Sequence, residues 1–269
     1  MTPAPTPPTT GSFQGLRDLR LIGWQVRFEQ LSFWLNPIGA IFTIGFSTVF
    51  LLIFESTAGR STVRALGDLR LIHYYVPGFV AYGLMSSCFS VLSIVIVNRR
   101  EMGLLKRLRL SPAPTWILLS AIFLSTMILC VLQIVLMLAV GRAFGVLGPA
   151  HWAPFLLALV VGMLSFTALG MGVSTLLPNA DAAGPVVNIV FFIVLAFSGL
   201  YFPLTPGSTL ADITDYFPVR RLIVSLQDSF NHIPGTSPWA WHDLAVLAAW
   251  GAAGVYLALR RWQWAPRRG

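Results

Sequence analysis

Charged residues are scarce in this sequence: Asp, Glu, Lys and Arg together make up 10% of its 269 residues. An average soluble domain contains about 25%. Hydrophobic residues make up 56% of the chain, and its mean hydropathy is +0.74. A water-soluble fold of this length could not cover its surface with so few charges, so the composition predicts an integral membrane protein.

Lysine and cysteine are almost absent, and both shortages bear on function. Lys106 is the only lysine and lies in Leu-Lys-Arg, whereas a phosphate-binding P-loop requires Gly-Lys-Ser/Thr. Cys88 and Cys130 are the only cysteines, and both lie inside apolar runs, which argues against a disulfide framework or a metal site. No Ser/His or paired-carboxylate arrangement falls at membrane depth. We therefore expect no enzyme activity, no metal and no cofactor in this chain.

The long apolar runs also lack charged residues. A carrier driven by protons or sodium usually keeps an ionisable group at membrane depth for coupling. The energy for any transport is therefore expected to come from another protein. The net charge of +8 comes from basic residues at the ends of the apolar runs. This distribution favours a topology signal and contacts with anionic lipid headgroups over nucleic-acid binding.

Four parts are expected along the chain. Residues 1–12 are rich in Pro and Thr and predict a disordered tail. Residues 13–36 predict an amphipathic interfacial helix, residues 37–260 an all-α domain of six transmembrane helices, and residues 261–269 a basic cytoplasmic tail. The six spans are expected near residues 37–54, 76–97, 110–141, 153–176, 185–202 and 239–259. Twelve of the 18 basic residues then fall in cytoplasmic segments, which predicts that both termini are cytoplasmic.

The interfacial helix has two interpretations. A step of about 100° per residue places Arg17, Arg20 and Arg27 on one side. Trp24 and Trp34 are typical of the membrane–water interface. The segment is either a simple anchor before the first span or a functional connecting helix, and its residues favour the two equally.

A basic segment, Asn98–Pro112, separates the second and third spans. It contains five cations and one anion, Glu101. As a helix, it would place Glu101 on the same face as Leu104, Leu105 and Leu108, with no cation four residues later. A partner protein could supply both an apolar groove and a cation for this face. The alternative is a topology anchor whose leucines lie in the headgroups, and the residues alone leave both open.

Residues 98–121, NRREMGLLKRLRLSPAPTWILLSA, resemble the cytoplasmic loop of ABC-2-type transporter permeases, including the daunorubicin-resistance and nodulation-export type. The matching pattern is an acidic residue, Gly, Leu, a basic-Leu pair and then Pro before the next span. In this chain these positions are Glu101, Gly103, Leu105, Lys106-Arg107-Leu108 and Pro112. The Tyr75-Val76-Pro77-Gly78 stretch is similar to the start of the family's second span, and the six-span layout also agrees. The long Pro/Thr tail and the outside Arg220-Arg221 pair depart from the pattern, which leaves the subfamily and the substrate open.

The resemblance implies that the basic segment is a coupling helix resting on a separate ATP-binding cassette subunit. The residues implied in this contact are Arg100, Glu101, Gly103, Leu104, Lys106, Arg107 and Leu108. Asp181, in the other inside turn, is a second candidate contact, although a simple turn residue is the alternative. ATP and Mg would be bound by the partner, and two permeases would assemble with two ATPase subunits in the bacterial cytoplasmic membrane. The expected substrate is an amphipathic drug, antibiotic or lipid-linked molecule.

The outside segment before the last span predicts a short helix that begins at Pro218. Leu222 and Leu226 recur on its apolar face, and it is too short to cross a bilayer. This helix is either re-entrant, forming an extracellular gate, or it lies on the outer surface. Two rival functions for the whole chain remain at this point: an ion-coupled secondary carrier and a non-transporting membrane scaffold.

Overall fold

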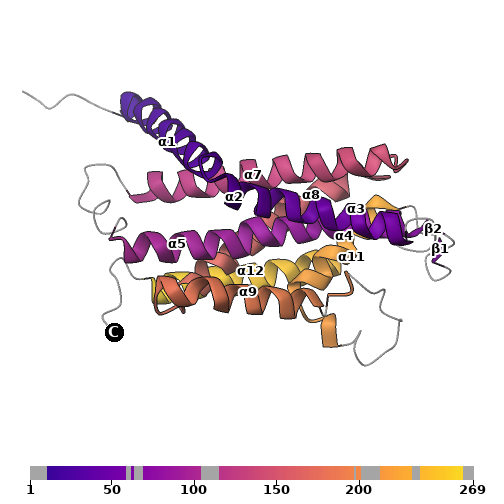
Figure 1. Cartoon of the computed structure of the whole chain (residues 1–269). Helices are drawn as coiled ribbons and strands as arrows, with labels where there is room; N and C mark the ends of the chain where they lie inside the picture. The colour runs from indigo at the N-terminus through magenta and orange to yellow at the C-terminus, as the bar shows by residue number, and fades with distance from the viewer. Residues whose placement is uncertain are drawn as a thin grey trace, which may run out of the picture.

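The computed structural model describes residues 11–58, 62–63, 69–103, 115–196, 198–200, 213–231 and 237–262. These residues are almost entirely helical, and the long helices run in one common direction while α1 diverges at one end (Figure 1). The first half contains α1 (Gly11–Trp34), α2 (Pro37–Ala40), the π-helix η1 (Ile41–Gly45), α3 (Phe46–Ala58), β1 (Thr62–Val63), β2 (Leu69–Arg70), α4 (Leu71–Met85), the π-helix η3 (Ser86–Val91) and α5 (Leu92–Glu101). The second half contains α7 (Thr115–Ala143), α8 (Trp152–Ser174), α9 (Ala180–Ala196), α11 (Pro218–Phe230) and α12 (Trp241–Arg261). The two short strands pair antiparallel, with Thr62 opposite Arg70.

Four helices in the described part of the chain are long and apolar enough to cross a membrane: Leu71–Glu101, Ser120–Ala143, Trp152–Ser174 and Trp241–Arg261. Two shorter apolar helices, Thr43–Thr57 and Ala180–Ala196, lie in the regions of the expected first and fifth spans. The chain is therefore a polytopic helical membrane protein, as its composition predicts. The residues of the expected interfacial helix form α1, which begins at Gly11, and most of the described large apolar side chains of α1 are exposed. Its place at the membrane interface stays a prediction.

Helix α9 begins at Ala180, five residues before the expected start of the fifth span at Pro185. The side-chain oxygen of Asn179 accepts a hydrogen bond from the backbone N–H of Ala182 at 2.9 Å. Asn is a favoured capping residue because its side chain satisfies an otherwise free N–H of the first turn. Pro185 consequently lies inside the helix, and Asp181 lies in its first turn.

A buried amide connects three helices in the middle of the bundle. Gln133 of α7 donates to the hydroxyl of Ser47 at 2.8 Å and to the carbonyl of Thr43 at 3.1 Å. Its side-chain oxygen accepts from Ser87 of η3 at 3.0 Å. In an apolar environment, an amide is stable only when such partners satisfy its donors and acceptors. Gln133 therefore holds the π-helices η1 and η3, together with α3, against α7.

A close contact joins α8 to α12 and depends on glycine. A Cβ atom added at Gly254 would lie 2.6 Å from the backbone of Ala168, and one added at Gly172 would lie 2.7 Å from the carbonyl oxygen of Gly254. No side chain fits at such distances. Without a large hydrophobic driving force in lipid, small residues that allow backbones to approach are a main source of helix association.

Candidate functional site at the C-terminal end of α5

The helix that carries Glu101 ends at this residue. The backbone N–H of Met102 still bonds to Asn98, and that of Gly103 bonds to Arg100 at 3.1 Å. Gly103 then adopts a φ of +66°, in the left-handed region that glycine tolerates and that commonly ends helices. The expected helical face that joins Glu101 to the leucines stays a prediction, because only its first residue is described. Leu104, Leu105, Lys106, Arg107 and Leu108 lie outside the described residues.

Arg100 is 3% exposed and is turned into its own chain. Its guanidinium donates to the carbonyl oxygens of Ser174 at 3.3 Å, Leu177 at 2.7 Å and Pro178 at 3.2 Å. These carbonyls lie at the C-terminal end of α8 and in the turn that follows. A helix C-terminus favours a cation, both for its free carbonyls and for its dipole. Arg100 thus fixes the end of α5 to the α8–α9 turn, and its direct contact with a partner subunit stays a prediction.

Glu101 has a nearer neighbour than the sequence indicates. Its carboxylate lies 3.9 Å from the guanidinium of Arg100, the preceding residue. The Glu101 side chain is 27% exposed, and among the described residues its Oε1 atom accepts no hydrogen bond. Glu101 therefore combines a partial internal charge pair with spare hydrogen-bonding capacity at the tip of the helix.

Arg99 makes the connection that the sequence does not reveal. Its Nη1 donates to Oε1 of Glu29 at 2.7 Å, and its Nη2 donates to Oε2 of the same carboxylate. Gln25 donates a third hydrogen bond to Glu29 at 3.0 Å. Planar two-point pairing of this kind is the strongest form of Arg–carboxylate contact. Glu29 is the only acidic residue in the second half of α1, and this was the one signal in the sequence that could have singled it out.

The interfacial helix is thus held at two points. Besides the Glu29–Arg99 pair, Gln30 donates to the hydroxyl of Ser125 at 2.8 Å and to its carbonyl at 2.9 Å. Together, these contacts attach α1 to both α5 and α7. Such a geometry fits a connecting helix better than a simple anchor, because α1 is linked to the tip that precedes the basic segment.

Asp181 is exposed in the first turn of α9, three residues after Pro178. Since Arg100 holds Pro178, and α5 packs beside α9, Glu101 and Asp181 lie at the same end of the bundle. This end is the left one in Figure 1. The two carboxyl groups proposed from the sequence as partner contacts are thus brought to one face of the molecule.

The helix expected outside the membrane lies at the opposite end, as α11 (Figure 1). It begins at Pro218, and Leu222 and Leu226 are fully buried because α11 packs against α4, α8 and α12. Arg221 donates to Asp243 of α12 at 2.5 Å, which gives one member of the Arg220-Arg221 pair a structural role. Packing on three helices favours an embedded position over a helix that only covers the surface, while its gating role stays a prediction.

Asp228 of α11 has an altered acidity. Burial raises its pKa to about 6, and the charge of Asp243 adds to this, while Arg220 acts in the opposite direction. Desolvation has this effect because it penalises the charged form of a carboxyl group. The carboxyl group therefore titrates close to physiological pH at the end of the bundle opposite Glu101.

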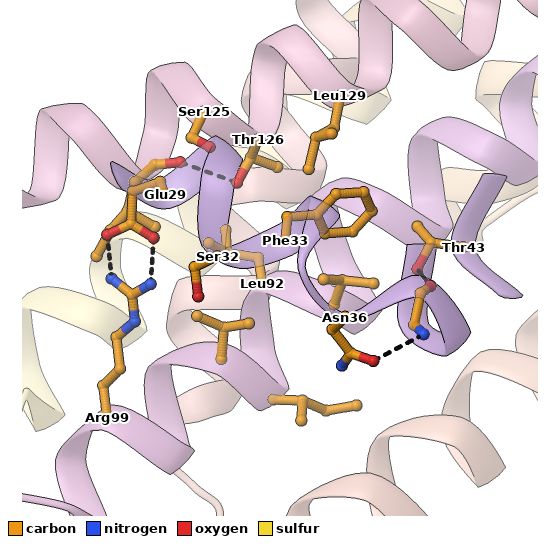
Figure 2. Close-up of a pocket in the computed structure, with 15 residues that line it drawn as sticks. Glu29, Ser32, Phe33, Asn36, Thr43, Leu92, Arg99, Ser125, Thr126 and Leu129 are labelled. Carbon is orange, nitrogen blue, oxygen red and sulfur yellow. Dashed lines mark hydrogen bonds and ion pairs between the residues drawn. The ribbon is translucent and has the colours of Figure 1, made fainter. Parts of the chain in front are cut away.

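A cavity of about 370 Å³ opens between α1, η1, α5 and α7 (Figure 2). The Glu29–Arg99 pair lies at one end of the cavity, and Asn36 and Thr43 lie at the other (Figure 2). Leu92 and Leu129 are among the apolar residues of its walls. This volume and this mixture of apolar walls with a few polar groups are typical of small-molecule sites in proteins.

Comparisons with known proteins agree with these features. A family model described as "ABC-2 family transporter protein" matches residues 56–260. A putative transport permease of Bacillus subtilis, YvfS, is 26% identical over 180 residues, covering 66% of this chain and 71% of the relative. A probable multidrug ABC transporter permease of Escherichia coli, YbhR, is 25% identical over 195 residues, covering 70% of this chain. The matched region spans 52% of YbhR, about half of its length.

Proposed function

The chain belongs to the ABC-2 family of transporter proteins, and from this premise we propose that it is the permease subunit of an ATP-driven exporter. In this proposal a separate ATP-binding cassette subunit binds ATP and Mg and supplies the energy. The substrate is an amphipathic drug, antibiotic or lipid-linked molecule that leaves across the bacterial cytoplasmic membrane. The multidrug description of YbhR is in keeping with that substrate class.

Six spans with both termini in the cytoplasm are part of the proposal. Helices α2, η1 and α3 follow one another without a gap from Pro37 to Ala58, which supports a first span. A helix rises about 1.5 Å per residue, so this run is about as long as the hydrocarbon core is thick. The 17-residue helix α9 would then be the fifth span. A second permease copy or paralogue and two ATPase subunits would complete the assembly.

The observation that carries the mechanism is the pair of opposite attachments at the end of α5. Arg99 binds α1 through Glu29, whereas the adjacent Arg100 binds the α8–α9 turn. A force applied just beyond Glu101 would therefore act on α1, α5 and α8 together. We assign the ATPase contact to Glu101, Gly103 and the basic segment that follows, with Asp181 as the second contact. Closure of the ATPase pair around ATP would then tilt these helices as a unit.

The test is ATP-dependent transport in proteoliposomes that contain the chain and its ATP-binding subunit. Glu101→Arg should insert normally but abolish transport and the stimulation of ATP hydrolysis, because it reverses the charge at the contact. Thr57→Arg is the matched control, since it adds an arginine at an exposed position on the opposite end of the bundle. Wild-type transport by Glu101→Arg would overturn the docking assignment.

Two further outcomes would overturn the proposed class itself. Transport that follows a proton gradient without any ATPase subunit would make the chain a secondary carrier. Efflux that is unchanged when the chain is deleted would make it a scaffold. Purification of the chain with its natural partners is the direct companion experiment, and it should recover a nucleotide hydrolase.

A further inference from the structure

We propose that the cavity between α1 and the bundle is a binding site for one phospholipid of the cytoplasmic leaflet. Its phosphate would lie on Arg99, and one acyl chain would occupy the apolar part of the cavity. The site lies within one copy of this chain and does not require the ATPase partner. It does not depend on the proposed transport activity, although its assignment to the cytoplasmic leaflet rests on the orientation given under the proposed function.

The headgroup end of the site is rich in free donors. The guanidinium of Arg99 has five N–H donors, and two of them donate to Glu29. The other three N–H groups have no acceptor among the described residues. The hydroxyl of Ser32, which also lines the cavity, likewise donates to none of these residues.

The acceptor at this end is largely occupied, since three of about four acceptor sites of the Glu29 carboxylate are in use. Glu29 is 8% exposed and accepts two hydrogen bonds from Arg99 and one from Gln25. A cationic ligand would have to compete with these donors for the carboxylate. An oxyanion, by contrast, can use the spare donors of Arg99 without breaking the pair, and planar guanidinium donors match phosphate oxygens well. The chemistry therefore selects a phosphate group.

Two apolar stripes lead from this end into the membrane. On α5, Val95 and Leu92 lie four and seven residues before Arg99, on the same helical face. On α7, Ile122 and Leu129 line the opposite wall, seven residues apart, which corresponds to about 10 Å of helix. Figure 2 shows Leu92 and Leu129 in the part of the cavity that lies beyond the ion pair. An apolar chain descending from Arg99 would thus follow both walls.

The cavity opens beside a helix that faces lipid. Large apolar side chains of α1, including Trp24, Phe28 and Leu31, are exposed, as expected for a helix in the membrane interface. Arg99 lies two residues before the end of α5, which places its guanidinium at headgroup depth. A molecule that enters the cavity from this side comes from the cytoplasmic leaflet, so its phosphate is expected to belong to a lipid.

The experiment uses the full-length chain in nanodiscs with a phospholipid that carries a diazirine on its acyl chain. After illumination, peptides of residues 91–99 and 122–129 should carry the label. Ser32→Trp fills the cavity from an exposed position and should reduce this labelling at least about tenfold, equivalent to 1.4 kcal/mol. Leu31→Trp is the control, because the side chain of Leu31, next to Ser32 in the sequence, is exposed and does not line the cavity. This variant should be labelled like the wild type.

Three arms identify the ligand chemistry. An excess of unlabelled phospholipid should compete, whereas an uncharged diacylglycerol, which has acyl chains but no phosphate, should compete at least about tenfold less well. Inorganic phosphate should leave the labelling unchanged. Equal competition by the diacylglycerol would overturn the role of Arg99, and displacement by inorganic phosphate would make the cavity a site for a soluble anion. Unchanged labelling of Ser32→Trp would overturn the site itself.

Discussion

The guanidinium of Arg100 donates a 2.7 Å hydrogen bond to the carbonyl oxygen of Leu177, so a side chain of α5 closes the end of α8. The two residues are 77 positions apart in the sequence. A helix end normally leaves carbonyl groups without intrahelical partners. Near lipid, a carbonyl group without a hydrogen-bond donor is costly in free energy. A charge that would be unfavourable elsewhere in an apolar bundle is stable here because three carbonyl groups surround it.

Arg100→Gln should therefore destabilise the protein by about 2–3 kcal/mol, since it removes charge-assisted hydrogen bonds and leaves buried carbonyl groups unpaired. Thermal unfolding in detergent measures the effect. Arg261→Gln is the control, because Arg261 also lies in the last turn of a helix but is exposed. A melting temperature equally lowered by both substitutions would contradict the specific role of Arg100.

The ion pair between Glu29 and Arg99 predicts a charge-swap result. Arg99→Glu alone should destabilise the α1–α5 contact, because it places a second carboxylate beside a buried one. Combining it with Glu29→Arg should restore part of the loss, with a coupling energy of roughly 1–3 kcal/mol in a double-mutant cycle. The check is the melting temperature of the four variants together with protease sensitivity of α1. Strict additivity of the two single effects would show that the pair does not hold α1.

The sequence predicts the membrane class and four of the spans because lipid imposes a local rule. A segment in the hydrocarbon core must be apolar and must satisfy its own backbone hydrogen bonds, and both conditions can be evaluated from consecutive residues. The start at Pro218 follows from equally local chemistry, since proline fits the first turn of a helix. These features need no knowledge of tertiary packing.

The candidate site is less predictable because its contacts are long-range. Glu29 lies 70 positions before Arg99, and among several basic residues nothing local shows which one it binds. The sequence identified Arg100 and Glu101 as important but treated both as available to a partner. Whether a side chain turns inward depends on the position of the α8–α9 turn, which only the folded chain provides. The family resemblance supplied the docking hypothesis, but not the links from α5 to α1 and to α8.

The glycine contact between α8 and α12 gives a third prediction. Gly254→Ala should destabilise the bundle by about 1–3 kcal/mol, because the new methyl group would overlap the backbone of Ala168. Gly184→Ala is the matched control: it lies in α9, where an added Cβ meets no atom within 4 Å among its described surroundings. Its melting temperature should equal or exceed that of the wild type. If the two variants melt alike, the close α8–α12 approach does not contribute to stability.

Asp228 predicts a pH-dependent stability with a definite sign. Its pKa is about 6 in the folded chain against a model-compound value of 3.8, so between these values the folded state keeps a proton that the unfolded state releases. The free energy of unfolding therefore falls as the pH rises through this window, and above it the full cost of burying the charged carboxylate is present. Asp228→Asn removes this cost. Its melting temperature should exceed that of the wild type at about pH 7.5, and the difference should shrink towards about pH 4.

Two measurements decide whether burial of this carboxyl group causes the effect. Melting curves of wild type and Asp228→Asn are recorded across the pH range, alongside Asp181→Asn, which removes an exposed carboxyl group at the other end of the bundle. The Asp181 variant measures the effect of removing a carboxyl group that is not buried. A constant difference for Asp228→Asn at every pH would mean that the amide acts through packing. A variant less stable at neutral pH would mean that the charged carboxylate is itself stabilising, through Arg220.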